Sequence, residues 1–225
     1  ERPPFGGFLA APESEIARIF VSPGPINEPQ LRGEDDGLGF GAAFAAAGLG
    51  PGDRVLNTWS YHLVPAGLLL DEGLRSVGAA VIPAGVGGSE LQAKLVIELG
   101  VTCICASTAF FVTLAETIEG MGKKLPEAWR VKSALLGGEF GDWLGKRTRL
   151  EARYGIRTFA VYATADFGLI GLAVMGENLA LNVESRGYHV AVFNRTTTVV
   201  DALIAGRAKG KKFTGCHSLE ELVAA

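Results

Sequence analysis

A short segment rich in glycine and alanine, in the last third of the chain, has the residue types that cradle a phosphate. It follows an apolar run and reads Gly171-Leu172-Ala173-Val174-Met175-Gly176. Gly171 makes a tight turn. Ala173 has a side chain small enough for a pyrophosphate to approach the backbone, and Gly176 lets a helix pack closely on a strand. Backbone N–H groups and the positive end of the helix dipole then face the phosphates. The segment predicts a site for a dinucleotide.

A second polar segment, Asn194-Arg195-Thr196, ends the next expected strand, about twenty residues later. Proteins that bind NAD usually place an acid here, which accepts hydrogen bonds from the ribose 2'-hydroxyl. Arg195 instead offers a guanidinium that can pair with a 2'-phosphate and stack on adenine, while Asn194 and Thr196 add short polar side chains. The pair of segments predicts NADP(H) rather than NAD(H). The alternative is a glycine turn near a solvent-facing arginine.

At these residues the sequence resembles a known family. The stretches 167–182, 193–196, 208–210 and 218–222 closely resemble the amino terminus of decarboxylating 6-phosphogluconate dehydrogenase, over about 60 residues without an evident gap. The resemblance implies cofactor binding. The catalytic lysine and the all-helical substrate domain of that family would lie beyond Ala225, so we expect no catalytic residue in this chain.

Residues 1–165 resemble a different family, the central stretch of the phenylacetate-CoA ligase group of adenylate-forming enzymes. The resemblance is carried, in the family's order, by 16–25, 50–55, 78–83, 137–139 and 162–166. It implies that Gly138 and Glu139 lie along an adenine and that Tyr162 packs near it. Asp166 would stand where a magnesium-binding glutamate is expected, so ATP and Mg²⁺ are the implied ligands of this part.

The resemblance has a departure at the phosphate loop. The family's loop is rich in Ser, Thr and Gly and ends in Lys-Pro, whereas 22–29 here reads Ser-Pro-Gly-Pro-Ile-Asn-Glu-Pro. The lysine is missing and prolines remove backbone donors. Because the family's later ribose-binding aspartate and mobile C-terminal domain are also missing, a complete acyl-CoA ligase is not expected.

The elements that must position these residues alternate between strands and helices. Apolar strands of four to six residues, separated by amphipathic helices, predict a mainly parallel buried sheet with helices on its faces. We expect strands at 16–21, 53–57, 79–83, 102–106, 131–136 and 157–162, and a loop at 22–29. The pattern restarts at Asp166 with strands at 167–170, 189–193 and 212–215. The fold class is therefore α/β: an adenylate-forming-like fragment over 1–165, then an incomplete Rossmann unit over 166–225.

Composition narrows the choice of partners. The chain has 225 residues, 48% of them hydrophobic, with a net charge of -3 and a pI near 5.7. No broad basic surface is expected, so nucleic acid is not a predicted partner. No apolar run approaches the length of a membrane span and no leader precedes a cleavage site, so we expect a soluble, cytoplasmic protein. The chain starts at Glu1 and stops inside a helix expected from Ser218, so we expect both ends to be cut.

Three interpretations remain open at this point. The chain is an NADP(H)-binding module without chemistry of its own, or the remnant of an adenylate-forming ligase that binds ATP or an aryl-CoA, or an accidental fusion of two coding fragments. The sequence leaves the oligomeric state and the acyl substrate undetermined.

Overall fold

The computed structural model describes residues 4–7, 9–24, 26–33, 36–138, 143–164, 168–172, 180–181, 183–185, 187–193 and 197–224. Of these, residues 143–144, 162–164, 168–172, 219 and 223–224 are described by their backbone alone. The chain divides into two compact units, Glu1–Leu169 and Ile170–Ala225. None of the described helices combines the length and the apolar character needed to cross a bilayer.

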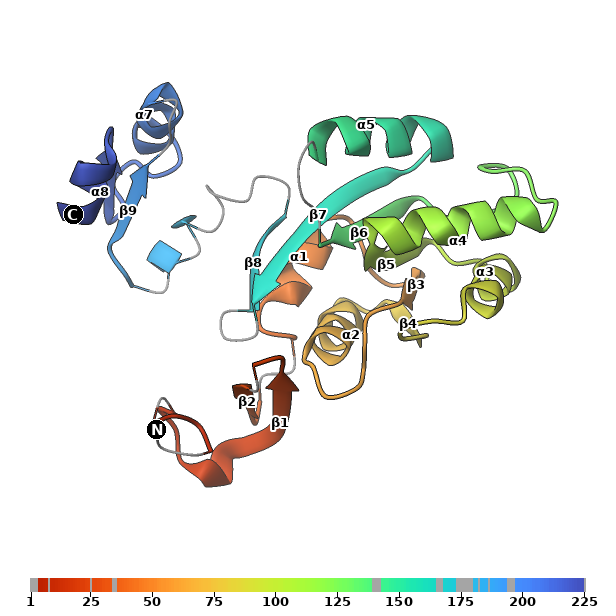
Figure 1. Cartoon of the computed structure of the whole chain (residues 1–225), viewed down its shortest axis with the longest axis horizontal. Helices are drawn as coiled ribbons and strands as arrows, with labels where there is room; N and C mark the ends of the chain where they lie inside the picture. Colours follow the sequence, from red (N-terminus) through yellow and green to blue (C-terminus); the bar gives the residue numbers. More distant parts are fainter. Residues whose placement is uncertain are drawn as a thin grey trace. The chain divides into compact units, whose positions relative to one another are not determined.

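A six-stranded sheet forms the centre of the first unit (Figure 1). Its strand order is β4-β3-β5-β6-β7-β8, and the pairs β3–β4, β3–β5, β5–β6 and β6–β7 are parallel. The strands are β3 Arg54–Asn57, β4 Ala80–Pro83, β5 Cys103–Ser107, β6 Ser133–Gly137, β7 Arg157–Thr164 and β8 Gly168–Leu172. The predicted α/β fold with a mainly parallel sheet is confirmed.

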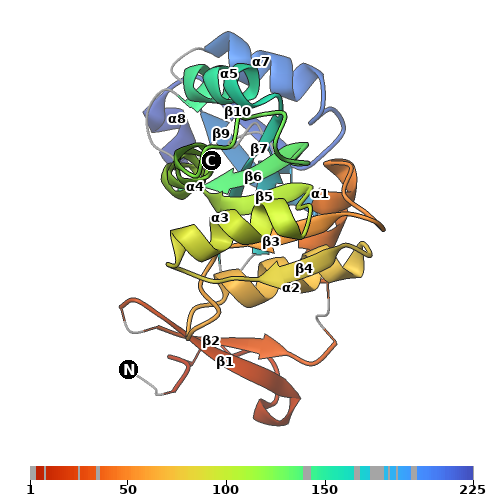
Figure 2. The same ribbon diagram turned by 90° about the vertical axis from the view of Figure 1, so that its right-hand side faces the viewer.

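Helices connect successive strands and cover the sheet (Figure 2). They are α1 Phe40–Ala46, α2 Ala66–Ser76, α3 Ser89–Glu98, α4 Thr108–Gly120 and α5 Trp143–Tyr154. In the sheet, β4 lies on one side of β3, whereas β5, β6 and β7 follow one another on its other side. Right-handed crossovers therefore place α2 on one face and α3, α4 and α5 on the other. On the second face the rings of Phe111, Trp129 and Tyr154 pack together, with centroids 5.6 to 6.2 Å apart.

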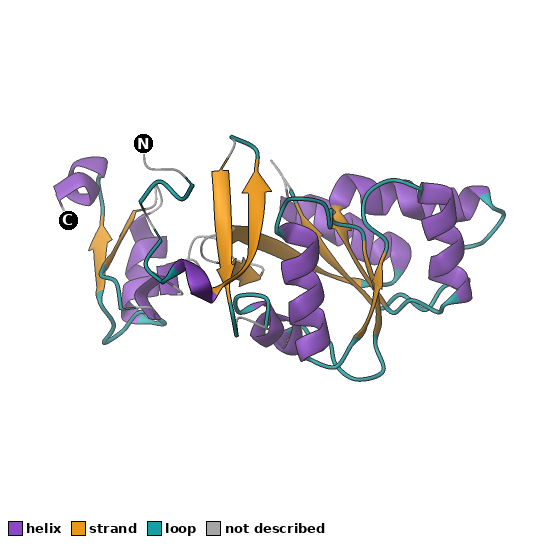
Figure 3. Cartoon of the chain, turned by 90° about the horizontal axis from the view of Figure 1, so that it is seen from below, coloured by secondary structure: helices purple, strands orange, loops and turns teal. Residues whose placement is uncertain are grey.

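A hairpin precedes the sheet (Figure 3). After a short 3₁₀ turn at Glu13–Glu15, strand β1 Ile16–Ser22 pairs antiparallel with β2 Ile26–Leu31. The prediction of a loop over 22–29 is wrong, because Pro29 lies inside β2. Proline is tolerated in a strand that has a free edge. Buried Glu72 of α2 ties the hairpin to the sheet domain: it accepts a 2.8 Å hydrogen bond from Gln30 and pairs with Arg18.

The strand before the glycine segment is placed differently from the prediction. We expected it at 167–170 as the first strand of the second series, but β8 lies next to β7 in the sheet of the first unit. Only three residues separate β7 from β8 in the sequence. Strands adjacent in sequence usually pair, because the open edge of the preceding strand is the nearest partner for their backbone groups.

The second unit contains a parallel pair of strands, β9 Val190–Phe193 and β10 Phe213–Cys216. Helix α7 Thr197–Ala205 connects them, and α8 Leu219–Ala224 follows β10. Residues 180–181 and 183–185, which precede β9, are helical. A strand, a crossover helix and a second parallel strand form the repeating element of a Rossmann sheet.

Candidate functional site

The polar segment 194–196 joins the carboxyl end of β9 to the start of α7. Ligands of open parallel sheets bind outside the carboxyl ends of the strands, so this is the position where a ligand is expected. Helix α7 packs closely on β10: a Cβ atom built on Gly215 would lie 2.9 Å from Cγ1 of Ile204 and 3.0 Å from Cγ1 of Val200. Asn194, Arg195 and Thr196 themselves lie outside the described residues, so their roles stay predictions.

The glycine segment is described in part. Gly171 and Leu172 form the end of β8, whereas Ala173, Val174, Met175 and Gly176 lie outside the described residues. The helix that follows is fixed at Glu184, whose carboxylate accepts a 3.1 Å hydrogen bond from the backbone N–H of Lys212. That bond and the nearby Lys211 ammonium hold the pKa of Glu184 below its ordinary value. The helix expected to carry the phosphate-facing N–H groups is thereby tied to the start of β10.

Two histidines of the second unit connect its elements. His189, before β9, lies 3.0 Å from the hydroxyl of Thr214 in β10, and His217, after β10, lies 2.8 Å from Asp201 in α7. Within the part of the chain that the structure describes, no three His, Cys, Asp or Glu side chains converge as a metal site. The predicted magnesium ligand Asp166 lies outside that part.

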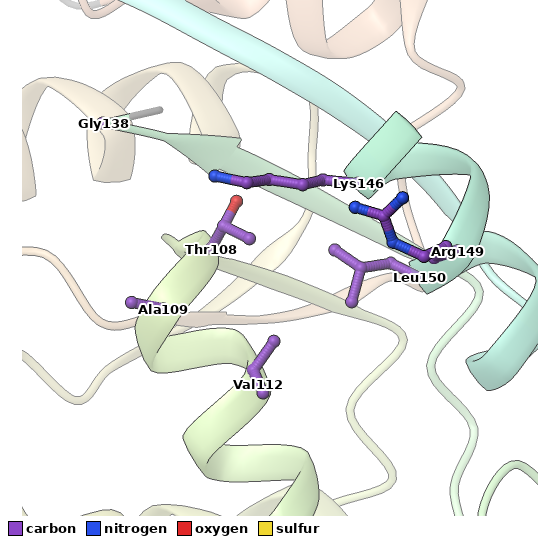
Figure 4. A pocket seen from close by; sticks show the side chains of 7 residues that line it. All are labelled: Thr108, Ala109, Val112, Gly138, Lys146, Arg149 and Leu150. Carbon is purple, nitrogen blue, oxygen red and sulfur yellow. The ribbon is translucent and has the colours of Figure 1, made fainter. Parts of the chain in front are cut away.

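The predicted adenine residues of the first unit fall at the carboxyl ends of β6 and β7. Gly138 follows β6 with a φ of 74°, in the left-handed region that favours glycine. Tyr162 lies in β7, where its backbone alone is described, and Glu139 lies outside the described residues. Gly138 lines a cavity of about 520 Å³ between the start of α4 and α5 (Figure 4).

Sequence reasoning missed the other residues around this cavity, which are Thr108, Ala109, Val112, Lys146, Arg149 and Leu150. Lys146 and Arg149 lie three residues apart in α5, and nothing in the sequence around them indicates that α4 faces them. A second, smaller cavity of about 200 Å³ lies at the ends of β3 and β5 and is lined by Thr58, Trp59, Val86, Gly87, Ser107 and Phe110.

The two helices that border the larger cavity are fixed by hydrogen bonds. Ser107 caps α4, and its hydroxyl oxygen accepts from the N–H of Phe110 at 3.2 Å. In α5 the Glu151 carboxylate accepts from the N–H of Thr158 at 2.8 Å and from its hydroxyl at 3.0 Å, and it pairs with Arg147 at 3.0 Å. Partial burial raises the pKa of Glu151, but these bonds outweigh it and hold the pKa below its ordinary value.

Replacing Glu151 with glutamine is expected to make the free energy of unfolding of the first unit depend less steeply on pH in the acid range. Because the folded pKa lies below the ordinary value of 4.5, the carboxylate stabilises the fold above that value. This stabilisation is lost as the pH falls through the lowered pKa. Urea unfolding followed by tryptophan fluorescence at a series of acid pH values measures it. Glu98→Gln, in an exposed pair with Lys94, is the control, and an unchanged acid slope in Glu151→Gln would contradict the assignment.

Sequence comparison finds a family match for the last part of the chain. Residues 166–225 match the family described as the NAD binding domain of 6-phosphogluconate dehydrogenase. The decarboxylating 6-phosphogluconate dehydrogenase of Dictyostelium discoideum is 69% identical over 61 residues, which are 27% of this chain and 12% of that protein. The enzyme of Treponema pallidum (strain Nichols) is 71% identical over 59 residues, 26% of this chain and 12% of that protein. The chain thus spans a small part of these relatives.

Several of the similar solved structures are CoA ligases. An open conformation of 2-hydroxyisobutyryl-CoA ligase, in complex with 2-HIB-AMP and CoA, superposes with a TM-score of 0.66 at 22% identity. The match covers 72% of this chain and 39% of that one. A long-chain-fatty-acid-CoA ligase from Archaeoglobus fulgidus gives a TM-score of 0.53 at 16% identity, over 75% of this chain and 36% of that one. At these identities the similarity shows the fold alone.

Proposed function

We propose that residues 166–225 bind NADP(H) through two segments: the backbone of 171–176 and the side chains of Asn194, Arg195 and Thr196. The observation that supports this is the family match, which spans both segments in one stretch. The pyrophosphate would lie on the backbone N–H groups that follow β8, and the 2'-phosphate would lie beyond the carboxyl end of β9. The start of α7 adds the positive end of a nine-residue helix near that phosphate.

The test is a comparison of NADPH and NADH in the Arg195→Ala variant. The guanidinium forms a charge-assisted contact of about 1.5 to 3 kcal/mol with the 2'-phosphate. We therefore expect NADPH affinity to fall by about tenfold or more. NADH affinity should change much less, because NADH lacks that phosphate. Titration of the full chain, followed by the fluorescence of the bound nicotinamide, measures both.

Arg207→Ala is the matched control, since it removes the same charge from the exposed turn after α7. It should leave both affinities unchanged. Equal losses for NADPH and NADH in Arg195→Ala, or no loss for either, would refute recognition of the 2'-phosphate by this segment.

A second proposal concerns the first unit, which we propose binds ATP or an aryl-CoA with Mg²⁺ through Gly138, Glu139, Tyr162 and Asp166. It is supported by the ligase-like fold and by the placement of Gly138 and Tyr162 at the carboxyl ends of neighbouring strands. Titration with ATP, with and without Mg²⁺, tests it. No effect of Mg²⁺ on ATP affinity would refute the metal role of Asp166.

A further inference from the structure

The cavity between α4 and α5 has the size of a small-molecule site. Its volume of about 520 Å³ falls within the usual range of about 300 to 1,000 Å³ for ligand pockets. Its walls come from three elements: the end of β6 at Gly138, the first two turns of α4, and one face of α5. These elements belong to one compact unit, so the cavity is a feature of the first unit alone.

One side of the cavity is positively charged. Lys146 and Arg149 lie three residues apart on α5 and both line it. In Figure 4 the Lys146 side chain extends from α5 towards the hydroxyl of Thr108, and the Arg149 guanidinium lies beside the Lys146 stem. Among the described residues, none of those lining the cavity is acidic, and Arg149 forms no ion pair with another described residue. An anion in the cavity would be attracted by the guanidinium of Arg149 through a charge-assisted hydrogen bond.

The start of α4 adds to the positive potential in the cavity. Thr108 and Ala109 are the first two residues of a thirteen-residue helix and both line the cavity. The first N–H groups of a helix have no acceptor within the helix, and the helix dipole favours negative charge at this end. The hydroxyl oxygen of Ser107 accepts a hydrogen bond from the N–H of Phe110, which lies two residues after Thr108.

The other side of the cavity is apolar. Val112 lies one turn into α4 and Leu150 lies beside Arg149 on α5, and in Figure 4 their side chains point toward each other. Ala109 continues this surface. An inorganic anion would make no contact with this apolar surface, whereas an anionic group attached to a compact apolar body would pack against it.

We infer that this cavity binds a small organic anion, a phosphate or carboxylate group attached to a compact apolar body. Arg149 and Lys146 pair with the oxyanion at the start of α4, and Val112 and Leu150 contact the apolar body. The site is distinct from the dinucleotide segments of the second unit. It shares Gly138 with the proposed ATP site, but its other residues lie on α4 and α5 and are not part of that site.

The test is titration of the full chain with three probes: phenyl phosphate, inorganic phosphate and phenol. Phenyl phosphate presents both halves of the inferred ligand, and each of the others presents one. We expect phenyl phosphate to bind about tenfold or more tightly than either. Benzoate as a fourth probe distinguishes a carboxylate ligand from a phosphate ligand. Calorimetry measures the affinities, and equal affinity for phenyl phosphate and inorganic phosphate would overturn the apolar half of the site.

Variants locate the binding. Arg149→Gln and Lys146→Gln should each weaken phenyl phosphate binding about fivefold or more, whereas Lys94→Gln removes an exposed charge from α3 and should have no effect. Val112→Phe keeps the charge but fills the cavity, so it should also weaken binding. Gly176→Val, in the dinucleotide segment, should leave phenyl phosphate binding unchanged. Undetectable binding, or binding that Arg149→Gln and Lys146→Gln leave intact, would overturn the inference.

Discussion

Replacing Gly73 with valine is expected to destabilise the first unit by about 3 kcal/mol or more. Gly73 lies in α2 where α1 crosses it, and a Cβ atom there would lie 2.5 Å from Cβ of Phe40 and 3.1 Å from the backbone nitrogen of Gly41. The crossing is close from the other helix as well, because a Cβ atom on Gly41 would lie 2.3 Å from Oγ of Ser76. Any side chain at Gly73 must therefore push the two helices apart.

Tryptophan fluorescence during urea unfolding measures this effect on the first unit alone. All three tryptophans of the chain, Trp59, Trp129 and Trp143, belong to that unit. Gly73→Ala should lower the free energy of unfolding by about 1 to 3 kcal/mol.

Gly120→Ala is the matched control. It makes the same change at the end of α4, where a Cβ atom meets no other atom within 4 Å. Alanine favours a helix over glycine by up to about 1 kcal/mol, so this variant should be neutral or slightly stabilising. If Gly73→Ala and Gly120→Ala had the same effect, the close crossing of α1 and α2 would not be a determinant of stability.

The second large effect is expected from Gly176→Val, which should weaken the binding of both NADPH and NADH by about a hundredfold, or about 2.8 kcal/mol. In the predicted fingerprint this glycine lets the helix pack on the strand and keeps the path of the pyrophosphate open. Both dinucleotides carry the pyrophosphate, so both should lose affinity alike. This pattern differs from the selective loss of NADPH expected in Arg195→Ala.

Unfolding of the first unit supplies the control for that experiment. Gly176 belongs to the second unit, so the tryptophan-monitored transition of Gly176→Val should match that of the unsubstituted chain. Retention of either dinucleotide at its original affinity would show that 171–176 is not the phosphate cradle. A coupled loss of first-unit stability would show that the variant acts through folding instead.

The sequence determined most of the elements by itself. Segments such as 102–106 and 131–136 are short, rich in apolar residues and flanked by amphipathic segments, and they overlap with the buried central strands β5 and β6. These predictions succeed because a strand covered on both faces needs mostly apolar residues on both faces, which is a local property. The family resemblance of 166–225 could likewise be recognised from its residues, and the family match confirms it.

Only the tertiary structure decided which strands pair and which side chains converge. The residues of β2 include a proline and looked like a loop, but the open edge of β1 provides a partner that sequence patterns do not reveal. The pairing of β8 with the sheet of β7 was decided in the same way, by which edge is nearest. Thr108 and Arg149 are far apart in the sequence, and they line one cavity only because α4 and α5 lie close together in the fold. Backbone hydrogen bonding and packing between distant segments are satisfied in three dimensions, so local periodicity cannot specify them.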